Sequence, residues 1–259
     1  MAIVLKEKHE LELMRRANQI VTIVLEAMRD VVAPGVTTAE LDQLAEKIIR
    51  QHKAVPSFKG YPHSSVNDFP ASICTSINQE VVHGIPSRDR VLKEGDIVSI
   101  DVGTIYRGYQ GDGAITLPVG HVSREAQRLI EVTQAALTVG IAQTWPGNRT
   151  GDISRAIERY VRSRGYQVVR EYTGHGIGKA MHEEPQVPNY YVSGMQDYLL
   201  EPGLTLALEP MVNVGTWKTR ALSNGWTVET ADGKLSAHFE HTVAVTDGEP
   251  EVLTRFHSV

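Results

Sequence analysis

Apolar residues recur every three or four positions over residues 10–32, and this spacing predicts an amphipathic helix of about six turns. The apolar positions are Leu13, Met14, Ala17, Ile20, Val21, Val24 and Met28. Pro34-Gly35 is expected to end this helix. Thr37 and Glu40 form a capping box for a second helix, which is expected to run to about His52.

A polar, turn-rich stretch over residues 54–69 predicts a long surface loop. β-Branched residues then predict strands over residues 71–77, 96–102 and 109–117. The last two strands are separated by Tyr106-Arg107-Gly108, so we expect them to form a hairpin.

The same order of elements begins again after Pro118. A helix is predicted over residues 124–142, Pro146-Gly147 ends it, and Thr150 is predicted to cap another helix before further strand-like segments. Short motifs also match: Pro34-Gly35…Thr38…Leu41 with Pro146-Gly147…Thr150…Ile153, His83-Gly84-Ile85 with His175-Gly176-Ile177, and Leu92…Glu94-Gly95…Asp101 with Leu200…Pro202-Gly203…Glu209.

This internal repeat predicts an α+β fold with two pseudo-symmetric halves, at about residues 7–118 and 119–253, each built as helix, helix and strands. We expect a single catalytic domain over residues 1–259. Two independent domains are the alternative, and it is disfavoured because no linker rich in Pro, Gly or Ser separates the halves. A functional site is expected where the halves meet.

Charge and composition narrow the class of function. The net charge of −5 argues against a general phosphate-binding surface, so no nucleic-acid specificity is expected. Cys74 is the single cysteine, which excludes an internal disulfide and a thiolate zinc cluster and suits a reducing compartment. No apolar run is long enough for a membrane span or a secretory signal. We therefore expect a soluble, cytoplasmic protein.

Two aspartates in the predicted hairpin give the first indication of chemistry. With the reversal at Tyr106-Arg107-Gly108, Asp101 and Asp112 are expected to lie about opposite each other on one face. Facing carboxylates repel each other, so a cation between them would explain the pair. Two solvent-facing aspartates near a turn are the alternative, because turns are rich in Asp and Gly.

The repeat adds further candidate ligands. It aligns Asp101 with Glu209 and His83 with His175, and Glu240 lies in a strand-like segment of the second half. Carboxylates with an imidazole suit two divalent ions such as Mn, Fe, Co or Zn. Paired ions can hold a bridging hydroxide as nucleophile and polarise a carbonyl group. The residues therefore predict a hydrolase with a dinuclear metal site.

Seven motifs, in the same order along the chain, closely resemble those of the type I methionine aminopeptidases, which have the pita-bread (creatinase/aminopeptidase) fold. They are Asn78-Gln-Glu-Val-Val-His83-Gly-Ile-Pro86, Ile100-Asp101-Val, Gly111-Asp112, Gly174-His175-Gly-Ile-Gly178, His182-Glu183-Glu184-Pro185, Leu208-Glu209-Pro210-Met211-Val-Asn213 and Phe239-Glu240-His241-Thr242. The resemblance covers about residues 7–253. It implies hydrolytic removal of the initiator methionine from nascent proteins and peptides, with a preference for a small second residue.

The resemblance also implies the metal ligands. Asp112 and Glu240 are expected to bridge two ions. Asp101 would complete the ligands of one ion, and His175 with Glu209 would complete those of the other. Glu209 would in addition shuttle the proton of the attacking water.

Two histidines are implied to contact the substrate. His182 is expected to contact the scissile amide, and His83 to help stabilise the intermediate. A neutral imidazole can donate a hydrogen bond to an oxyanion or a leaving nitrogen, and preorganised donors of this kind contribute roughly 3–4 kcal/mol. An open metal position that takes the free α-amine of the substrate would explain a preference for chain ends.

The methionine side chain of the substrate is implied to enter a pocket lined by Cys74, Phe69, Trp226 and Met181, with Tyr61 as a further candidate. Each of these residues could instead be ordinary core. Two departures from the family pattern bear on selectivity. Met181 stands where an aromatic residue is usual, and the loop over residues 62–68 is longer than the common form.

The remaining histidines are expected to lie outside the site. His241 should point away from it, because neighbours on a strand face opposite sides. His238 shares a face with Glu240, so an approach to the metals is the alternative, but His238 is not expected among the ligands. His63 is expected to be solvated in its loop.

Two other functions are weighed against aminopeptidase activity. An Xaa-Pro dipeptidase of the same fold shares the five metal-binding residue types but usually has a sizeable domain before the catalytic half, whereas here the first catalytic helix begins near residue 10. A non-catalytic relative would be expected to lack ligands, and all five are present. The short, bacterial-style form suggests a monomer that meets nascent N-termini at the ribosome, without a membrane partner. The ligand types leave the ions as Co, Mn, Fe or Zn.

Overall fold

The structure is a computed structural model that describes residues 3–63 and 65–256. The elements in chain order are α1 (Lys8–Val31), α2 (Thr38–Gln51), β1 (Val55–Pro56), β2 (Ile73–Ile77), β3 (Glu80–Val82), β4 (Ile97–Tyr106), β5 (Tyr109–Pro118), α3 (Arg124–Ile141), α4 (Thr150–Ser163), β6 (Gln167–Val168), β7 (Gly174–Gly176), β8 (Glu183–Val187), β9 (Thr205–Leu208), β10 (Met211–Asn213), β11 (Thr219–Ala221), β12 (Val228–Thr230), β13 (Ser236–His238), β14 (Glu240–Ala244) and β15 (Glu251–Val252).

The four predicted helices are present, and the capping box of α2 is confirmed. The Thr37 hydroxyl accepts a hydrogen bond from the N–H of Glu40 (3.2 Å), and the Glu40 carboxylate accepts one from the N–H of Thr37 (2.8 Å). The prediction that Thr150 caps α4 was wrong. Thr150 is the first helical residue, and Arg149 occupies the cap position because Asp152 accepts its N–H (2.8 Å).

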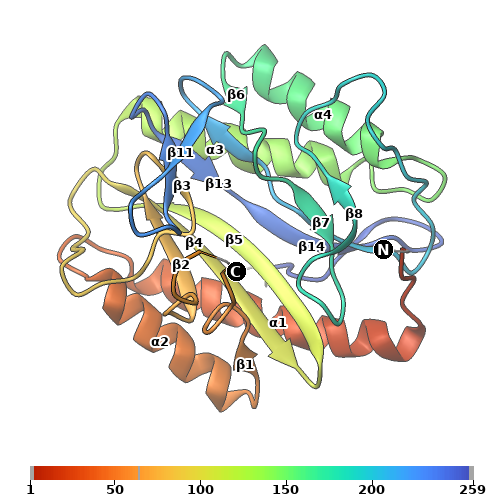
Figure 1. The fold of residues 1–259 in the computed structure, drawn as a ribbon, viewed down its shortest axis with the longest axis horizontal. Coiled ribbons are helices and arrows are strands. Elements are labelled where there is room, and N and C mark those ends of the chain that lie inside the picture. The colour runs from red at the N-terminus through yellow and green to blue at the C-terminus, as the bar shows by residue number, and fades with distance from the viewer. Residues whose placement is uncertain (1–2, 64, 257–259) are drawn as a thin grey trace.

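One antiparallel sheet runs through both halves of the chain (Figure 1), in the order β1-β4-β5-β14-β9-β7-β8, with β2 paired to β4 and β15 to β14. In this view α1 and α2 lie below the strands, and α3 and α4 lie above them. Strand β14 pairs with β5 of the first half and with β9 of the second. It therefore joins the two halves at the centre of the sheet.

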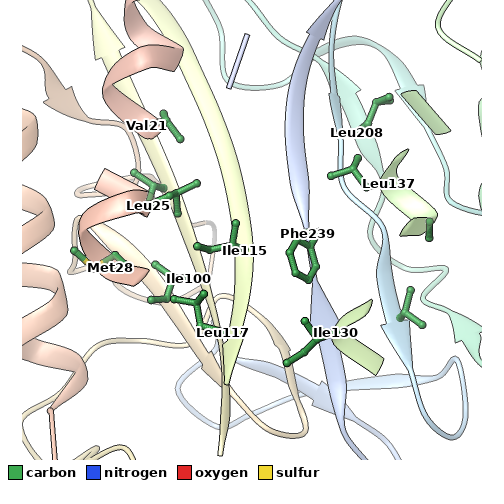
Figure 2. Packing of buried hydrophobic residues seen from close by; sticks show 14 of the residues in the cluster. Val21, Leu25, Met28, Ile100, Ile115, Leu117, Ile130, Leu137, Leu208 and Phe239 are labelled. Atoms are coloured by element: carbon green, nitrogen blue, oxygen red, sulfur yellow. The ribbon is translucent and has the colours of Figure 1, made fainter. Parts of the chain in front are cut away.

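Helix α1 packs closely on the β4–β5 hairpin because glycines open that face of the sheet. A Cβ on Gly111 would come within 2.7 Å of the backbone of Ala17, and one on Gly113 within 3.2 Å of the Val21 side chain. Figure 2 shows Leu25 and Met28 of α1 beside Ile100 of β4 and Ile115 of β5. All four of these apolar side chains are buried.

The internal repeat predicted from the sequence recurs in the hydrogen bonds that end the first helix of each half. Gly35 donates its N–H to the carbonyl of Leu92 (2.8 Å), and Gly147 donates its N–H to the carbonyl of Leu200 (3.0 Å). Both glycines have positive φ, 93° and 90°. The repeated Pro-Gly sequence therefore forms an equivalent turn after the first helix of each half.

No helix within the described ranges is both long and apolar enough to cross a membrane.

Candidate metal centre and active site

Asp101 and Asp112 lie on one face of the hairpin, but not directly opposite each other. Asp101 pairs with Ala114, and Asp112 pairs with Gly103, so the two carboxylates are diagonal neighbours. The expected register was wrong because the reversal is a tight turn at Arg107 and Gly108, with φ of 49° and 84°, between the paired Tyr106 and Tyr109. Diagonal positions on one face still leave the two side chains neighbours.

The carboxylates point away from α1. Gly111 and Gly113 face that helix, and successive residues of a strand face opposite sides, so Asp112 faces the other side of the sheet. Asn18 on α1 accepts the backbone N–H of Asp112 through its side-chain oxygen (3.2 Å). The packing of α1 therefore fixes the backbone from which Asp112 projects.

The second half contributes His175 on β7, Glu209 directly after β9, and Glu240 at the start of β14. One ligand atom each of Asp112, His175 and Glu240 lie within 4.8 Å of one another. His175 Nε2 is 3.4 Å from Glu209 Oε1. His175 Nδ1 is 2.9 Å from the carbonyl of Gly176, so Nε2 is the ring nitrogen that faces the carboxylates.

The side chains at this site fit divalent metal ions. Asp101 Oδ1, Asp112 Oδ1 and Glu240 Oε1 are buried oxygens with no hydrogen-bond partner among the described residues. Burial raises the pKa of Asp101 to about 7, and burial with the neighbouring carboxylates raises the pKa of Asp112, Glu209 and Glu240 well above the ordinary range. Unpaired buried carboxylates that repel each other are stabilised by a cation. Oxygen ligands with one imidazole suit divalent first-row ions.

Burial lowers the pKa of His175 to about 3 and that of His83 to about 4. Both rings are therefore neutral near pH 7, which is the form that ligates a metal or donates a single N–H. His182 Nδ1 is 2.8 Å from the Tyr61 hydroxyl, and its ring centroid is 4.4 Å from that of His175.

All of the predicted site residues line one cavity of about 180 Å³. The predicted metal ligands and the two substrate histidines are Asp101, Asp112, His175, Glu209, Glu240, His83 and His182, and the predicted pocket residues are Cys74, Phe69, Trp226, Met181 and Tyr61. The structure thus brings the residues together, while the role of each one stays a prediction.

The sequence analysis missed three lining residues, namely Phe58, Tyr172 and Thr173. The Tyr172 ring packs edge-on against His83, with 5.7 Å between centroids. Tyr172 and Thr173 directly precede the Gly174-His175 motif, so their position next to a predicted ligand could have identified them as lining residues. Phe58 lies in the turn-rich stretch after α2, which gave no comparable signal.

The three histidines expected outside the site have different surroundings. His241 Nδ1 bonds to the Thr254 hydroxyl (2.8 Å), in agreement with the expectation that it points away. His238 approaches the site, which was the less favoured alternative, with Nε2 3.9 Å from Glu209 Oε2. His63 is not simply solvated, because its ring packs on Trp226 at 4.9 Å. Its loop also binds Trp226, whose Nε1–H donates to the carbonyl of Asn67 (2.8 Å).

Buried carboxylates and imidazoles where two pseudo-symmetric halves meet define a metallohydrolase site. The model of metallopeptidase family M24 matches residues 12–247. The chain is 54% identical over 252 residues to a methionine aminopeptidase of Clostridium acetobutylicum, covering 97% of this chain and 98% of that one. It is 48% identical over 253 residues to methionine aminopeptidase 1 of Bacillus subtilis, covering 98% and 99%. The chain belongs to metallopeptidase family M24, among its methionine aminopeptidases.

Solved structures agree with this assignment. The methionine aminopeptidase of Thermotoga maritima superposes with a TM-score of 0.94 at 41% identity, covering 98% of this chain and all of that one (100%). A prolidase of Pyrococcus furiosus superposes with a TM-score of 0.75 at 21% identity and covers 98% of this chain but 66% of its own. The second likeness shows the shared pita-bread fold alone.

Proposed function

We propose that this chain is a metal-dependent aminopeptidase that removes the N-terminal methionine from nascent proteins and peptides and prefers a small second residue. The observation that carries the proposal is the single cavity in which a buried carboxylate and imidazole cluster adjoins an apolar, sulfur-containing wall. A flexible thioether packs well against aromatic rings and sulfur, so this wall suits a methionine side chain. The near full-length methionine aminopeptidase relatives support the same substrate.

The site is proposed to hold two divalent ions. Asp112 and Glu240 would bridge them, with Asp101 on one ion and His175 with Glu209 on the other. Four carboxylates provide enough oxygen ligands and negative charge for two ions. The identity of the ions is proposed as Co, Mn, Fe or Zn. When bound, such ions supply an activated water as nucleophile and polarise the scissile carbonyl group.

The side chains then have separate tasks. Glu209 would accept and return the proton of the attacking water, because its carboxylate lies at the proposed metal site, 3.4 Å from His175 Nε2. His182 would donate to the scissile amide from the ring nitrogen that Tyr61 leaves free. His83 would stabilise the developing negative charge from the Tyr172 side of the cavity.

Cys74, Phe69, Trp226 and Met181 are proposed to hold the methionine side chain. Phe69 and Trp226 form an edge-on pair with centroids 5.2 Å apart, and both Cys74 and Met181 are buried. Since Met181 replaces a rigid aromatic ring, we infer a more adaptable pocket.

Residues 1–259 are proposed to act as one catalytic domain, because the central sheet continues from β5 to β14 across the two halves. The protein is also proposed to act as a monomer. The proposed place of action is the cytoplasm, where nascent N-termini leave the ribosome. The lone buried Cys74 suits that reducing compartment.

The test is release of free methionine from Met-Ala-Ser by chelator-stripped protein, with and without added Mn(II) or Co(II). Metal-dependent release is expected from the free peptide, and none from its N-acetylated form. An Xaa-Pro dipeptide is the control for the shared fold. Cleavage of the Xaa-Pro substrate in place of Met-Ala-Ser would overturn the proposal in favour of a dipeptidase, and cleavage of neither by metal-loaded protein would favour a non-catalytic role.

A further inference from the structure

The turn between β7 and β8, residues 177–182, carries two residues of the proposed active site, Met181 and His182. Lys179, Ala180 and His182 on this turn are exposed. Ile177 and Met181 of the same turn are buried, so it is the exposed residues that need further contacts to fix their position. The position of His182 therefore depends on what anchors the turn.

Glu183, the residue after His182, provides one anchor. Its Oε1 accepts the backbone N–H of Ala180 at 3.2 Å, so the carboxylate closes the turn on itself. On the opposite side, the carbonyl of Gly178 accepts the N–H of Gln110 from β5 at 2.8 Å. The turn is thus held at both ends by groups outside the substrate cavity.

The second oxygen of Glu183 binds a lysine from the segment before α1. Lys6 Nζ lies 2.6 Å from Glu183 Oε2, and the Lys6 side chain is only 2% exposed. The ammonium also donates to the carbonyl of Val4 (3.0 Å), and the Lys6 N–H donates to the carbonyl of Gly203 (2.8 Å). A lysine is almost never this deeply buried unless its charge is paired with an acidic group. Glu183 is that partner for Lys6.

Lys6 and Glu183 pack tightly against the backbone of the turn. A Cβ on Gly178 would lie 2.5 Å from Glu183 Oε1 and 2.5 Å from Lys6 Cε. The ammonium, the carboxylate and the turn backbone therefore form one close-packed unit. Removing charge from either partner is expected to change where the turn sits.

Stability alone is a weak explanation of this pair, because a buried ion pair pays a large desolvation cost and well-packed apolar residues are often as stable. A charged pair does, however, fix geometry through directed hydrogen bonds. We propose that Lys6 and Glu183 are positioning residues, which hold the β7–β8 turn where His182 meets the scissile amide. This inference rests on the proposed function of the site.

The test compares Lys6→Met with Arg15→Met. Arg15 also binds a distant carboxylate, Glu251, at 2.6 Å, but Glu251 lies on β15 and not on the turn. Lys6→Met is expected to lower kcat on Met-Ala-Ser about tenfold, with little change in KM, because a misplaced catalytic group costs rate rather than binding. Arg15→Met is expected to leave kcat unchanged. Lys6→Arg, which keeps the charge, is expected to recover part of the rate.

A double-mutant cycle separates positioning from general destabilisation. If Lys6 acts through His182, then Lys6→Met should cost almost nothing further in a His182→Ala background. The same tenfold loss in both backgrounds, or an equal loss from Arg15→Met, would overturn the proposal. Glu183→Gln keeps the shape of the side chain and is the second variant should Lys6→Met fail to fold; it is expected to lower kcat in the same way.

Amide hydrogen exchange gives a readout that needs no substrate. In Lys6→Met and Glu183→Gln the Ala180 amide is expected to exchange faster than in the wild type, while amides of β5 keep their protection. Unchanged protection of Ala180 in both variants would contradict the anchoring role even if the chain proved not to be an aminopeptidase. A wild type that releases no methionine would instead contradict the proposed function and leave this measurement valid.

Discussion

Asp101 and Glu209 occupy equivalent positions in the two halves of the molecule. Each follows at the same distance a glycine of positive φ, Gly95 (91°) and Gly203 (93°). The N–H of Gly95 donates a hydrogen bond to the carbonyl of Val119 (3.0 Å). The N–H of Gly203 donates one in the same way to the carbonyl of Val245 (2.9 Å). The two carboxylates therefore reach the shared cavity along equivalent backbone paths. This symmetry is consistent with the proposal that each carboxylate completes the ligands of one ion.

Asp112→Asn is expected to abolish metal binding and activity together while the fold is kept. The side chain keeps its shape but loses the charge that would bridge two ions, and its backbone contact with Asn18 is untouched. Metal titration by calorimetry and far-UV circular dichroism would check both parts. Full activity in this variant would refute the bridging role.

The metal-free protein is expected to lose stability as the pH rises from about 6.5 to about 8. Burial raises the pKa of Asp101 to about 7 from its ordinary 3.8, and burial with the neighbouring carboxylates raises the pKa values of Asp112, Glu209 and Glu240 well above their ordinary range. In this window the folded state binds more protons than the unfolded state, so the free energy of unfolding falls with pH. Below about pH 6.5 the buried histidines, whose pKa values are lowered, act in the opposite direction.

Urea unfolding at several pH values, with chelator or with saturating Mn(II), would measure this dependence. Bound cations hold the carboxylates ionised, so the metal-loaded protein should show a much smaller slope. Asp101→Asn should reduce the slope of the metal-free protein. A free energy of unfolding of the metal-free protein that stays constant or increases between about pH 6.5 and 8 would contradict the burial of these carboxylates.

Tyr61→Phe is expected to lower kcat by about two- to twelvefold, because a hydrogen bond typically contributes about 0.5–1.5 kcal/mol. The Tyr61 hydroxyl lies 2.8 Å from His182 Nδ1 and so orients that ring. Steady-state kinetics on Met-Ala-Ser would check the effect. Tyr160→Phe, on α4 and outside the cavity, is the matched control. Equal rates for Tyr61→Phe and the wild type would show that the ring is oriented by other contacts.

Met181→Ala is expected to raise KM for methionyl peptides by about tenfold or more, since lost apolar contacts in a pocket cost about 1–3 kcal/mol. Met181 is 6% exposed and lines the cavity. Met28→Ala is the control: Met28 belongs to α1 and is fully buried in the core, so truncating it should cost about 2–5 kcal/mol of stability without changing KM. A KM that is unchanged in Met181→Ala would place the methionine side chain elsewhere.

Much of the fold could be predicted from local patterns. The apolar stripe of α1, the Thr37–Glu40 capping box and the hairpin strands follow from interactions among residues close in sequence. The repeat of letters between the halves predicted equivalent turns, and the hydrogen bonds of Gly35 and Gly147 bear this out. The candidate ligands could also be named, because carboxylate and imidazole types determine which ions a site accepts.

Contacts between distant residues decided what the sequence could not. The diagonal placement of Asp101 and Asp112 depends on a tight turn and on its strand register. The approach of His238 to Glu209 depends on the pairing of β13 with β10, which places His238 opposite Met211. The burial of Lys6 against Glu183 joins residues from opposite halves of the chain. Periodicity and propensity act over a few neighbouring residues, whereas these positions result from packing all layers together at once, which a one-dimensional pattern does not contain.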